Sequence, residues 1–331
     1  MKKFINNPQN LTDELLEGYA AANADAVKLE EDRLIVSRAL DRADRVTVVG
    51  MGGSGHEPAP IGFVGEGMLD VSVSGDIFVA PEEKIAIKAL ERADRGKGVI
   101  FVVLNHEGDL LTGRLATEAC RAEGIDVREI VTQEDISASP RSRADQRRGL
   151  VGCILLYKIA GAAAASGMEI GAVQAVCQRF ADQMATLAVG VRGATHPVTG
   201  ASLAEFGDDD MEIGMGQHGE EGGGRMKLKT ADETACIMLD ALLRDLNLQS
   251  GEKVMLVLDG MGATTMMELL IVYRRCDAYL KEKNMEIAAN YIGNLLTVQE
   301  AAGFQMFLAR MDDELIRLWN APCDTPYFKK K

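Results

Sequence analysis

The chain is poor in the residues that build metal and disulfide frameworks. It has four histidines among 331 residues, and its six cysteines show no CxxC or CxxH spacing. Paired spacings of that kind are the usual signature of zinc sites, and cysteine-dense short chains are the usual signature of disulfide scaffolds. The sequence therefore predicts no metal site and a chain that keeps its cysteines reduced, as in the cytoplasm.

The chain also lacks an excess of basic residues and any long apolar run. Its formal net charge is −14, which opposes binding to nucleic acid or to an anionic membrane surface. The longest candidate for a membrane span, residues 149–167, is interrupted by Lys158, and residues 1–8 lack the apolar core of a signal peptide. We expect a cytoplasmic protein with neither nucleic acid nor membrane as a partner.

Loops that hold ATP phosphates are missing as well. There is no GxxxxGK[ST] loop and no kinase set of His-Arg-Asp with Asp-Phe-Gly, so a phosphate donor would have to be bound elsewhere. Gly50, Gly52 and Gly55 match a dinucleotide fingerprint in spacing only. The turn runs directly into His56-Glu57-Pro58, and Asp70 comes too early for the acidic residue of that fold. An oxidoreductase that uses a nicotinamide cofactor stays as an alternative.

Hydrophobic patterning predicts an α/β protein with mostly parallel or mixed sheets covered by helices. In the first half, continuous apolar runs predict buried strands that alternate with helices. The predicted strands there are 45–50, 98–105 and 127–131, and the helices are 83–95 and 111–123. In the second half the predicted strands are 211–216, 253–259, 287–292 and 304–310, and the helices are 231–246, 265–283 and 298–302.

Two long helices are expected between residues 149 and 187, and a domain boundary is expected at the end of that stretch. The predicted domains are residues 1–185, with the His56 turn and Asp109, and residues 186–331, with His218. Glycine-rich turns 50–56, 105–109 and 259–263 each follow a predicted strand, where ligands of open α/β sheets bind.

Two of the four histidines close glycine-rich turns. His56 ends Gly50-Met51-Gly52-Gly53-Ser54-Gly55, and His218 follows the alternating run 211–216. Imidazole is the side chain best suited to proton transfer and nucleophilic attack near neutral pH, and glycine lets a small ligand approach backbone N–H groups. The pair predicts one assembled site, whereas His106 and His196 fit structural roles. The acidic pair Glu220-Glu221 is interpreted as solvated loop.

Five spaced motifs, taken in order, closely resemble the substrate-binding subunit of dihydroxyacetone kinases. They are Gly52-Gly53-Ser54-Gly55-His56-Glu57-Pro58, Asn105-x-x-Gly108-Asp109, Arg147-Arg148-Gly149, Glu212-x-Gly214-x-Gly216-x-His218-Gly219-Glu220 and Gly260-Met261-Gly262-Ala263-Thr264. The resemblance extends from Lys2-Lys3-Phe4-Ile5-Asn6 to Thr325-Pro326, and so covers essentially the whole chain.

The resemblance implies a role for each matched residue. In that family a histidine at the position of His218 bonds through its ring nitrogen to the ketone carbon of a short ketose, forming a hemiaminal. The position of Asp109 carries the carboxylate that accepts the proton of the terminal hydroxyl, and that of His56 carries an imidazole that hydrogen-bonds the ketone. Backbone N–H groups at Gly52 and Gly53 would hold substrate oxygens. Such a trap selects carbonyl compounds over glycerol.

The resemblance also implies partners and leaves choices open. The nucleotide, Mg-ADP or Mg-ATP, is expected on a separate kinase subunit, with no cofactor in this chain, a phosphotransferase-system phosphocarrier as a further partner, and a homodimer. Leu104 stands where the family usually has a lysine beside the substrate, and His106, Glu107 and Met51 also depart from the pattern. The ketose, the phosphate donor, and the choice between a catalytic subunit and a ketose-sensing paralogue that co-activates a transcription factor stay open.

Overall fold

The computed structural model describes residues 3–331 and shows two α/β units, each built on its own six-stranded mixed sheet. Lys2, which belongs to the amino-terminal motif of the resemblance, lies outside the described residues. The first unit comprises residues 1–132, 153–181 and 317–331, and the second comprises residues 133–152 and 182–316. The predicted boundary at residues 185/186 falls three residues after the chain enters the second unit at Asp182, but the chain also passes between the units at three other points.

The first sheet has the strand order β1-β2-β4-β3-β5-β6. Its strands β4, β3, β5 and β6 are parallel, and β2 pairs antiparallel with both β1 and β4. The strands are β1 (Val27–Glu30), β2 (Leu34–Ser37), β3 (Thr47–Ser54), β4 (Val71–Ile77), β5 (Val99–Leu104) and β6 (Val127–Thr132). The α-helices are α1 (Leu11–Ala22), α2 (Glu83–Ala93), α3 (Glu107–Ala122), α4 (Gly152–Ala165) and α5 (Ile170–Asp182), and the carboxyl-terminal hairpin is β13 (Cys323–Asp324) with β14 (Lys329–Lys330).

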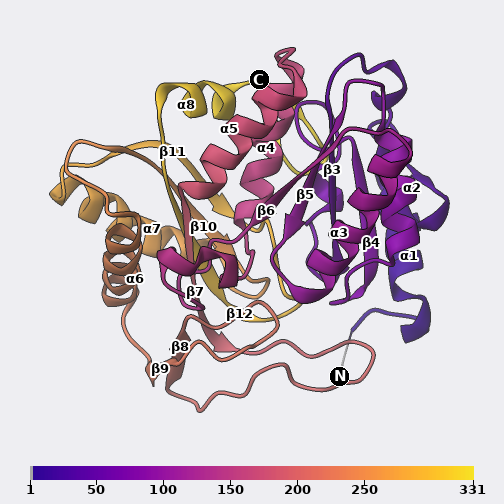
Figure 1. Ribbon diagram of the computed structural model, residues 1–331. Helices are drawn as coiled ribbons and strands as arrows, with labels where there is room; N and C mark the ends of the chain where they lie inside the picture. Colours follow the sequence, from indigo (N-terminus) through magenta and orange to yellow (C-terminus); the bar gives the residue numbers. More distant parts are fainter. Residues whose placement is uncertain (1–2) are drawn as a thin grey trace. The chain divides into compact units, whose positions relative to one another are not determined.

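Helices cover both faces of this sheet. Alternate residues of a strand point to opposite faces, and Val49 and Met51 belong to the core under α2 and α3, which lie alongside the strands in Figure 1. Gly50, between them, faces the other way, because a Cβ there would lie 3.0 Å from the Tyr157 ring of α4. Every residue of β5 is buried, which explains its unbroken apolar sequence.

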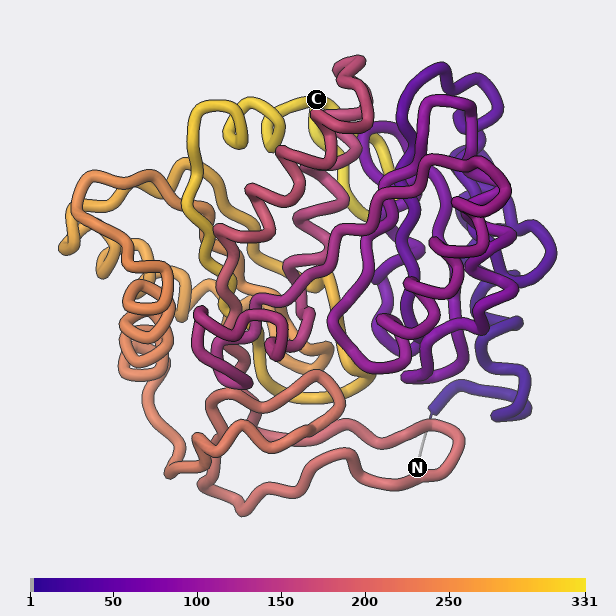
Figure 2. The backbone as a smooth tube through the Cα atoms, in the orientation of Figure 1, coloured from indigo at the N-terminus to yellow at the C-terminus, as the bar shows by residue number. Residues whose placement is uncertain are grey.

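The second sheet has the order β11-β10-β12-β7-β8-β9 and is mainly antiparallel, with only β10 and β11 parallel. Its strands are β7 (Met184–Arg192), β8 (Asp210–Ile213), β9 (Gly224–Lys227), β10 (Lys253–Gly260), β11 (Glu286–Gly293) and β12 (Ala302–Arg310). The helices α6 (Ala231–Leu246) and α7 (Met266–Glu282) pack on one face, while α8 (Asp313–Asn320) follows β12. Figure 2 shows the long connections on either side of β8 as irregular backbone.

Local sequence fixes the amino-terminal starts of α6 and α7, the two helices on this second sheet. Thr230 and Thr265 each close a capping box with the glutamate three residues on, Glu233 and Glu268. The helix predicted at 231–246 is confirmed, and the one predicted at 265–283 is confirmed with Thr265 as its cap. The short helix predicted at 298–302 is wrong, because residues 298–301 form a turn and Ala302 begins β12.

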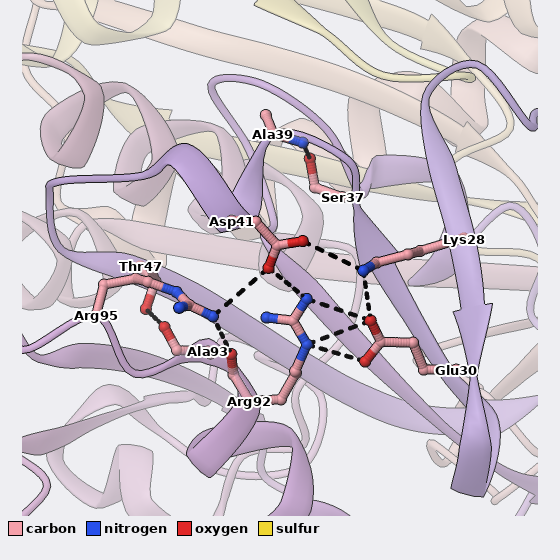
Figure 3. A network of polar contacts seen from close by, with 9 residues as sticks. All are labelled: Lys28, Glu30, Ser37, Ala39, Asp41, Thr47, Arg92, Ala93 and Arg95. Carbon is pink, nitrogen blue, oxygen red and sulfur yellow. Dashed lines mark hydrogen bonds and ion pairs between the residues drawn. The ribbon is translucent and has the colours of Figure 1, made fainter.

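A network of partly exposed charges ties β1 to the end of α2 (Figure 3). Arg92 Nε lies 2.9 Å from Glu30 Oε2, and Arg92 Nη2 lies 2.7 Å from Asp41 Oδ1. Lys28 Nζ lies 2.7 Å from Glu30 Oε1. Partial burial would raise the pKa of the Glu30 carboxyl, but the bonds from Arg92 and Lys28 lower it below its ordinary value.

Across residues 3–331, we find no helix whose length and apolar content would let it cross a bilayer.

Candidate functional site

The first part of the candidate site is the end of β3 together with the turn that follows it. A Cβ on Gly53 would approach the Val79 amide nitrogen to 2.7 Å, so this position needs glycine. On Gly52, by contrast, a Cβ would meet none of the described atoms within 4 Å, and open space lies beside that backbone. His56 is buried, and its ring lies 5.1 Å from the Phe78 ring with a tilt of 47°. The imidazole is therefore held by packing at the end of β3.

The Glu57 side chain closes the same turn through hydrogen bonds to its backbone. The Gly55 amide donates to the Glu57 carboxyl at 2.9 and 3.2 Å, and Gly55 has a φ of +99°, a conformation that glycine adopts readily. Burial raises the pKa of the Glu57 carboxyl, although the backbone N–H groups it accepts oppose that shift. The Glu57 side chain thus closes the turn, and the Ala59 amide adds a bond to the His56 carbonyl at 3.1 Å.

Asp109 lies in the first turn of α3, which begins at Glu107 just after β5 ends at Leu104. The helix predicted from residue 111 therefore begins four residues earlier, and residues 107–109 belong to it and not to a loop. A carboxylate in the first turn of a helix is favoured by the positive end of the helix dipole. Leu104, 8% exposed, ends the strand beside this turn.

The topology brings His56 and Asp109 to one edge of the first sheet. β3 and β5 are hydrogen-bonded neighbours that run parallel, with Thr47 paired to Val99 and Gly50 paired to Val102. Their carboxyl ends therefore lie at the same edge, where ligands of such sheets bind. Gly52, Gly53 and Leu104 lie at that edge too, since they are the last residues of these strands.

Tyr157 of α4 is a residue of this region that sequence reasoning missed. It is fully buried, and a Cβ on Gly50 would lie 3.0 Å from its Cζ atom. Burial raises the pKa of the Tyr157 phenol well above its ordinary value, and its neighbours Cys153 and Asp109 raise it further. The phenol therefore keeps its proton. Its place in an alanine-rich helix gave no signal of this contact.

The second unit carries His218 in the loop between β8 and β9. The strand predicted to run to Gly216 ends at Ile213, so His218 lies five residues beyond the strand. The loop closes on itself, because the Gly216 amide donates to the Glu220 carbonyl at 2.7 Å and the Gly219 amide donates to the Gly216 carbonyl at 3.1 Å. The His218 side chain is 29% exposed. A partly exposed imidazole at the tip of a closed loop can meet a small solute.

Glu220 is the carboxylate beside His218. Its Oε2 accepts the His218 amide at 2.9 Å, and its Oε1 lies 3.5 Å from His218 Nδ1. Burial would raise the pKa of the Glu220 carboxyl, but the bonds from the His218 ring and from the backbone lower it to about 2. Glu220 is an exposed residue of this loop, as interpreted, and its carboxylate also contacts the candidate nucleophile.

The remaining motif residues hold the second unit together. Arg147 is buried and binds the Asp245 carboxylate at 2.5 and 3.0 Å, so its role is structural. Asp259 at the end of β10 accepts the amides of Leu295 and Leu296 at 2.7 and 3.2 Å. Burial raises the pKa of the Asp259 carboxyl well above its ordinary value, and those two amides only partly oppose the shift.

The context of a dinucleotide site is absent from the described residues. β3 is followed by a turn and a three-residue 3₁₀ helix, Ile61–Phe63, in place of the long helix whose N-terminus receives a pyrophosphate. Asp70 is buried, and its carboxylate accepts both Arg45 Nη atoms at 2.9 Å and the Val48 amide at 2.9 Å. Because its carboxylate makes these structural contacts, Asp70 does not serve as the acidic residue that binds a ribose in dinucleotide sites. Support for the oxidoreductase alternative is therefore removed.

Comparisons with known proteins agree with this fold and cover the whole chain. The family model of the Dak1 domain matches residues 17–327. The dihydroxyacetone-binding subunit of PTS-dependent dihydroxyacetone kinase 2 from Listeria innocua is 34% identical over 331 residues, 99% of each chain. The L-erythrulose kinase of Pectobacterium atrosepticum is also 34% identical, and this chain spans 56% of that protein's length.

A solved structure, a co-activator of a dihydroxyacetone kinase operon, superposes with a TM-score of 0.91 at 29% identity. The match covers 96% of this chain and 98% of that one. The agreement of the family model, the full-length relative and this structure decides the family. The chain belongs to the Dak1 family, whose members include the substrate-binding subunits of dihydroxyacetone kinases.

Proposed function

We propose that the chain is the substrate-binding subunit of a dihydroxyacetone-type kinase, a phosphotransferase with an alcohol group as acceptor. It would bind a short ketose as a hemiaminal on His218 and present the terminal hydroxyl for phosphorylation by a separate nucleotide-bearing subunit. The observation that carries the proposal is the full-length similarity to a protein named a dihydroxyacetone-binding subunit. The presence of His56, Asp109 and His218 supports it.

The residues divide the chemistry between them. Neutral imidazole is a nucleophile, so His218 would attack the ketone carbon and select carbonyl compounds over polyols. The Asp109 carboxylate would accept the proton of the terminal hydroxyl as that oxygen attacks the phosphoryl group. His56 would donate a hydrogen bond to the substrate oxygen, and the amides of Gly52 and Gly53 would bind hydroxyl groups. Leu104 offers no donor, so the ketose would gain only apolar contact there.

Partners and setting are part of the proposal. The nucleotide, Mg-ADP or Mg-ATP, would be held by the partner kinase subunit, and this chain would carry no cofactor. The name of the Listeria relative includes PTS-dependent, which supports a phosphotransferase-system phosphocarrier as the source of phosphate. We further propose a homodimer in the cytoplasm, with a role in glycerol metabolism. Erythrulose is a second substrate to test, since one relative is named an L-erythrulose kinase.

Intact-mass spectrometry tests the hemiaminal. The protein is incubated with dihydroxyacetone or erythrulose and its mass is measured under native conditions without borohydride reduction. The mass should rise by that of one intact ketose, because an addition reaction releases no water. His218→Ala should abolish the adduct, and His196→Ala should leave it unchanged, since the His196 ring accepts the amides of Val198 and Thr199 within its own loop. An adduct that persists in His218→Ala contradicts the assignment.

A second candidate function has its own support. The superposition on a co-activator of a dihydroxyacetone kinase operon, at a TM-score of 0.91, fits a ketose-sensing regulatory protein that contacts a transcription factor. The departures at Leu104, His106 and Glu107 lie at or just beyond the carboxyl end of β5 and fit such a divergence, whereas Met51 lies inside β3 in the core under α2 and α3.

Turnover separates the two functions. With a matched phosphorylated donor subunit, the kinase reading predicts ketose phosphate. Asp109→Asn should keep the adduct and lose turnover, because only the proton acceptor is removed. Adduct formation without turnover, whichever donor subunit is supplied, would favour the sensor.

A further inference from the structure

The Glu220 carboxylate reaches both the backbone and the ring of His218. Oε2 accepts the His218 amide at 2.9 Å, and Oε1 lies 3.5 Å from Nδ1. Catalytic hydrogen bonds of this kind are often long before substrate binds and shorten in the complex. Glycines at 216 and 219 let the loop fold this tightly, and Gly219 has a φ of +84°. The loop therefore brings the carboxylate to one specific nitrogen of the ring.

The charge of Glu220 decides which ring nitrogen carries the proton. Because its pKa is lowered to about 2, Glu220 is an anion at neutral pH and can only accept hydrogen bonds. The neutral imidazole has one N–H and one lone pair, and the partner of one nitrogen sets the state of the other. A carboxylate at Nδ1 therefore stabilises Nδ1–H and leaves the lone pair on Nε2.

Arg148 lies beside Gly216, as the Glu220 carboxylate does. A Cβ on Gly216 would overlap both Arg148 Nη1 and Glu220 Oε2, so the guanidinium and the carboxylate lie close together there. The Arg148 Nε donates to Asp135 Oδ2 at 2.8 Å, and Nη2 donates to Ser137 Oγ at 3.0 Å. With Asp135 fully buried, these bonds give the guanidinium a fixed orientation beside Gly216.

We propose that Glu220 is the positioning residue that fixes His218 in the Nδ1–H tautomer and so presents Nε2 as the nucleophile. The inference rests on the proposed function, which makes His218 the attacking group. The Nε2 lone pair forms the C–N bond, and the carbonyl π electrons move to oxygen, which takes a proton from a general acid. The imidazole then carries a positive charge beside Glu220 until Nδ1–H is released to a base, and the adduct is neutral.

The tautomer can be measured without any ketose. Long-range ¹H–¹⁵N spectra of ¹⁵N-histidine-labelled protein, with the signal of residue 218 assigned through His218→Ala, should show protonated Nδ1 and unprotonated Nε2. Glu220→Gln should shift the population toward Nε2–H, and Glu220→Asp should keep Nδ1–H in part. Glu221→Gln, which removes the neighbouring exposed carboxylate and the same charge, should leave the spectrum unchanged. A spectrum that is the same in Glu220→Gln overturns the inference.

The rate of ketose addition provides the second readout. Glu220→Gln should slow adduct formation on the order of ten- to a hundredfold, the range seen when an orienting partner of a histidine is removed. Glu221→Gln should react at the wild-type rate, and circular dichroism melts should show that both variants fold. Should the wild type form no adduct with any ketose while the tautomer depends on Glu220, the proposed function fails and the positioning role stands. Addition at an undiminished rate in Glu220→Gln overturns the role.

Discussion

Replacing Asp259 by asparagine should stabilise the protein at alkaline pH and change little at acidic pH. The side chain is fully buried at the end of β10, and its Oδ1 accepts the amides of Leu295 and Leu296. Its Oδ2 has no hydrogen-bond partner within the described part of the chain. Asparagine keeps the accepting oxygen and puts a neutral group where the second oxygen lies, so it reproduces the protonated form of the aspartate.

The sign follows from the raised pKa of this carboxyl. For an acid whose folded pKa lies above its unfolded value, the stability contribution is fully present below the unfolded pKa. It is lost as pH rises toward the folded pKa, at about 1.4 kcal/mol per pH unit for one proton. A buried polar group without a partner costs about 1–3 kcal/mol. We therefore expect Asp259→Asn to gain about 1–3 kcal/mol at pH 8 and close to nothing at pH 4.

Thermal melts across this pH range make the test. Each kcal/mol corresponds to a rise in Tm of about 2–4 °C in a protein of this size class. Asp208→Asn, an exposed residue of the same unit, removes the same charge without relieving burial and should leave Tm nearly constant. A loss of stability in Asp259→Asn that is equal at pH 4 and pH 8 would refute the reasoning, because it would mean that the ionised carboxylate is no burden to the folded state.

Two further predictions concern the first unit. Arg92→Ala should cost about 0.5–1 kcal/mol of stability at pH 7, since its partner carboxylates are partly exposed. Because the pKa of Glu30 is lowered in the folded state, that stability is present above the unfolded pKa and lost as pH falls through the folded pKa. Melts of variant and wild type should therefore converge in acid, and a gap that persists there counts against the ion pair. Gly53→Ala should lower stability by about 1–3 kcal/mol through the clash with Val79, whereas Gly52→Ala, which meets open space, should melt like the wild type; equal melting of the two variants would contradict the geometry.

The parts of the fold that follow from local sequence were predictable. Hydrophobic patterning placed α6 and α7 to within one residue of their starts, where capping boxes at Thr230 and Thr265 stand, and the apolar run 98–105 gave β5. β4 was missed although Val71, Ser72, Val73 and Ser74 alternate between apolar and polar residues. Ser72 and Ser74 are buried as well as the valines, because both faces of this strand are covered, and periodicity alone does not reveal that.

The candidate site was predictable to the same extent. Glycine turns after strands pointed to His56, and the topology of β3 and β5 accounts for its presence at one edge with Asp109. The roles of Tyr157 and Glu220 were not recognised, although Glu220 belongs to the same matched motif as His218, because these roles depend on contacts with residues distant in sequence or on the closure of a loop. The roles of His56, Asp109 and His218 in catalysis stay predictions for the mass and turnover experiments.

The repeated passage of the chain between its two units limits how the protein can be divided. Expression of residues 1–185 alone would include Arg147 and Val151 without their partners Asp245 and Gln305. The same fragment would lack Leu318, whose carbonyl receives the buried Lys158 ammonium. Division of the chain between residues 185 and 186 therefore removes partners of buried polar groups from both halves. Neither half should be recovered as a soluble fragment, and assays of ketose capture call for the uncut polypeptide.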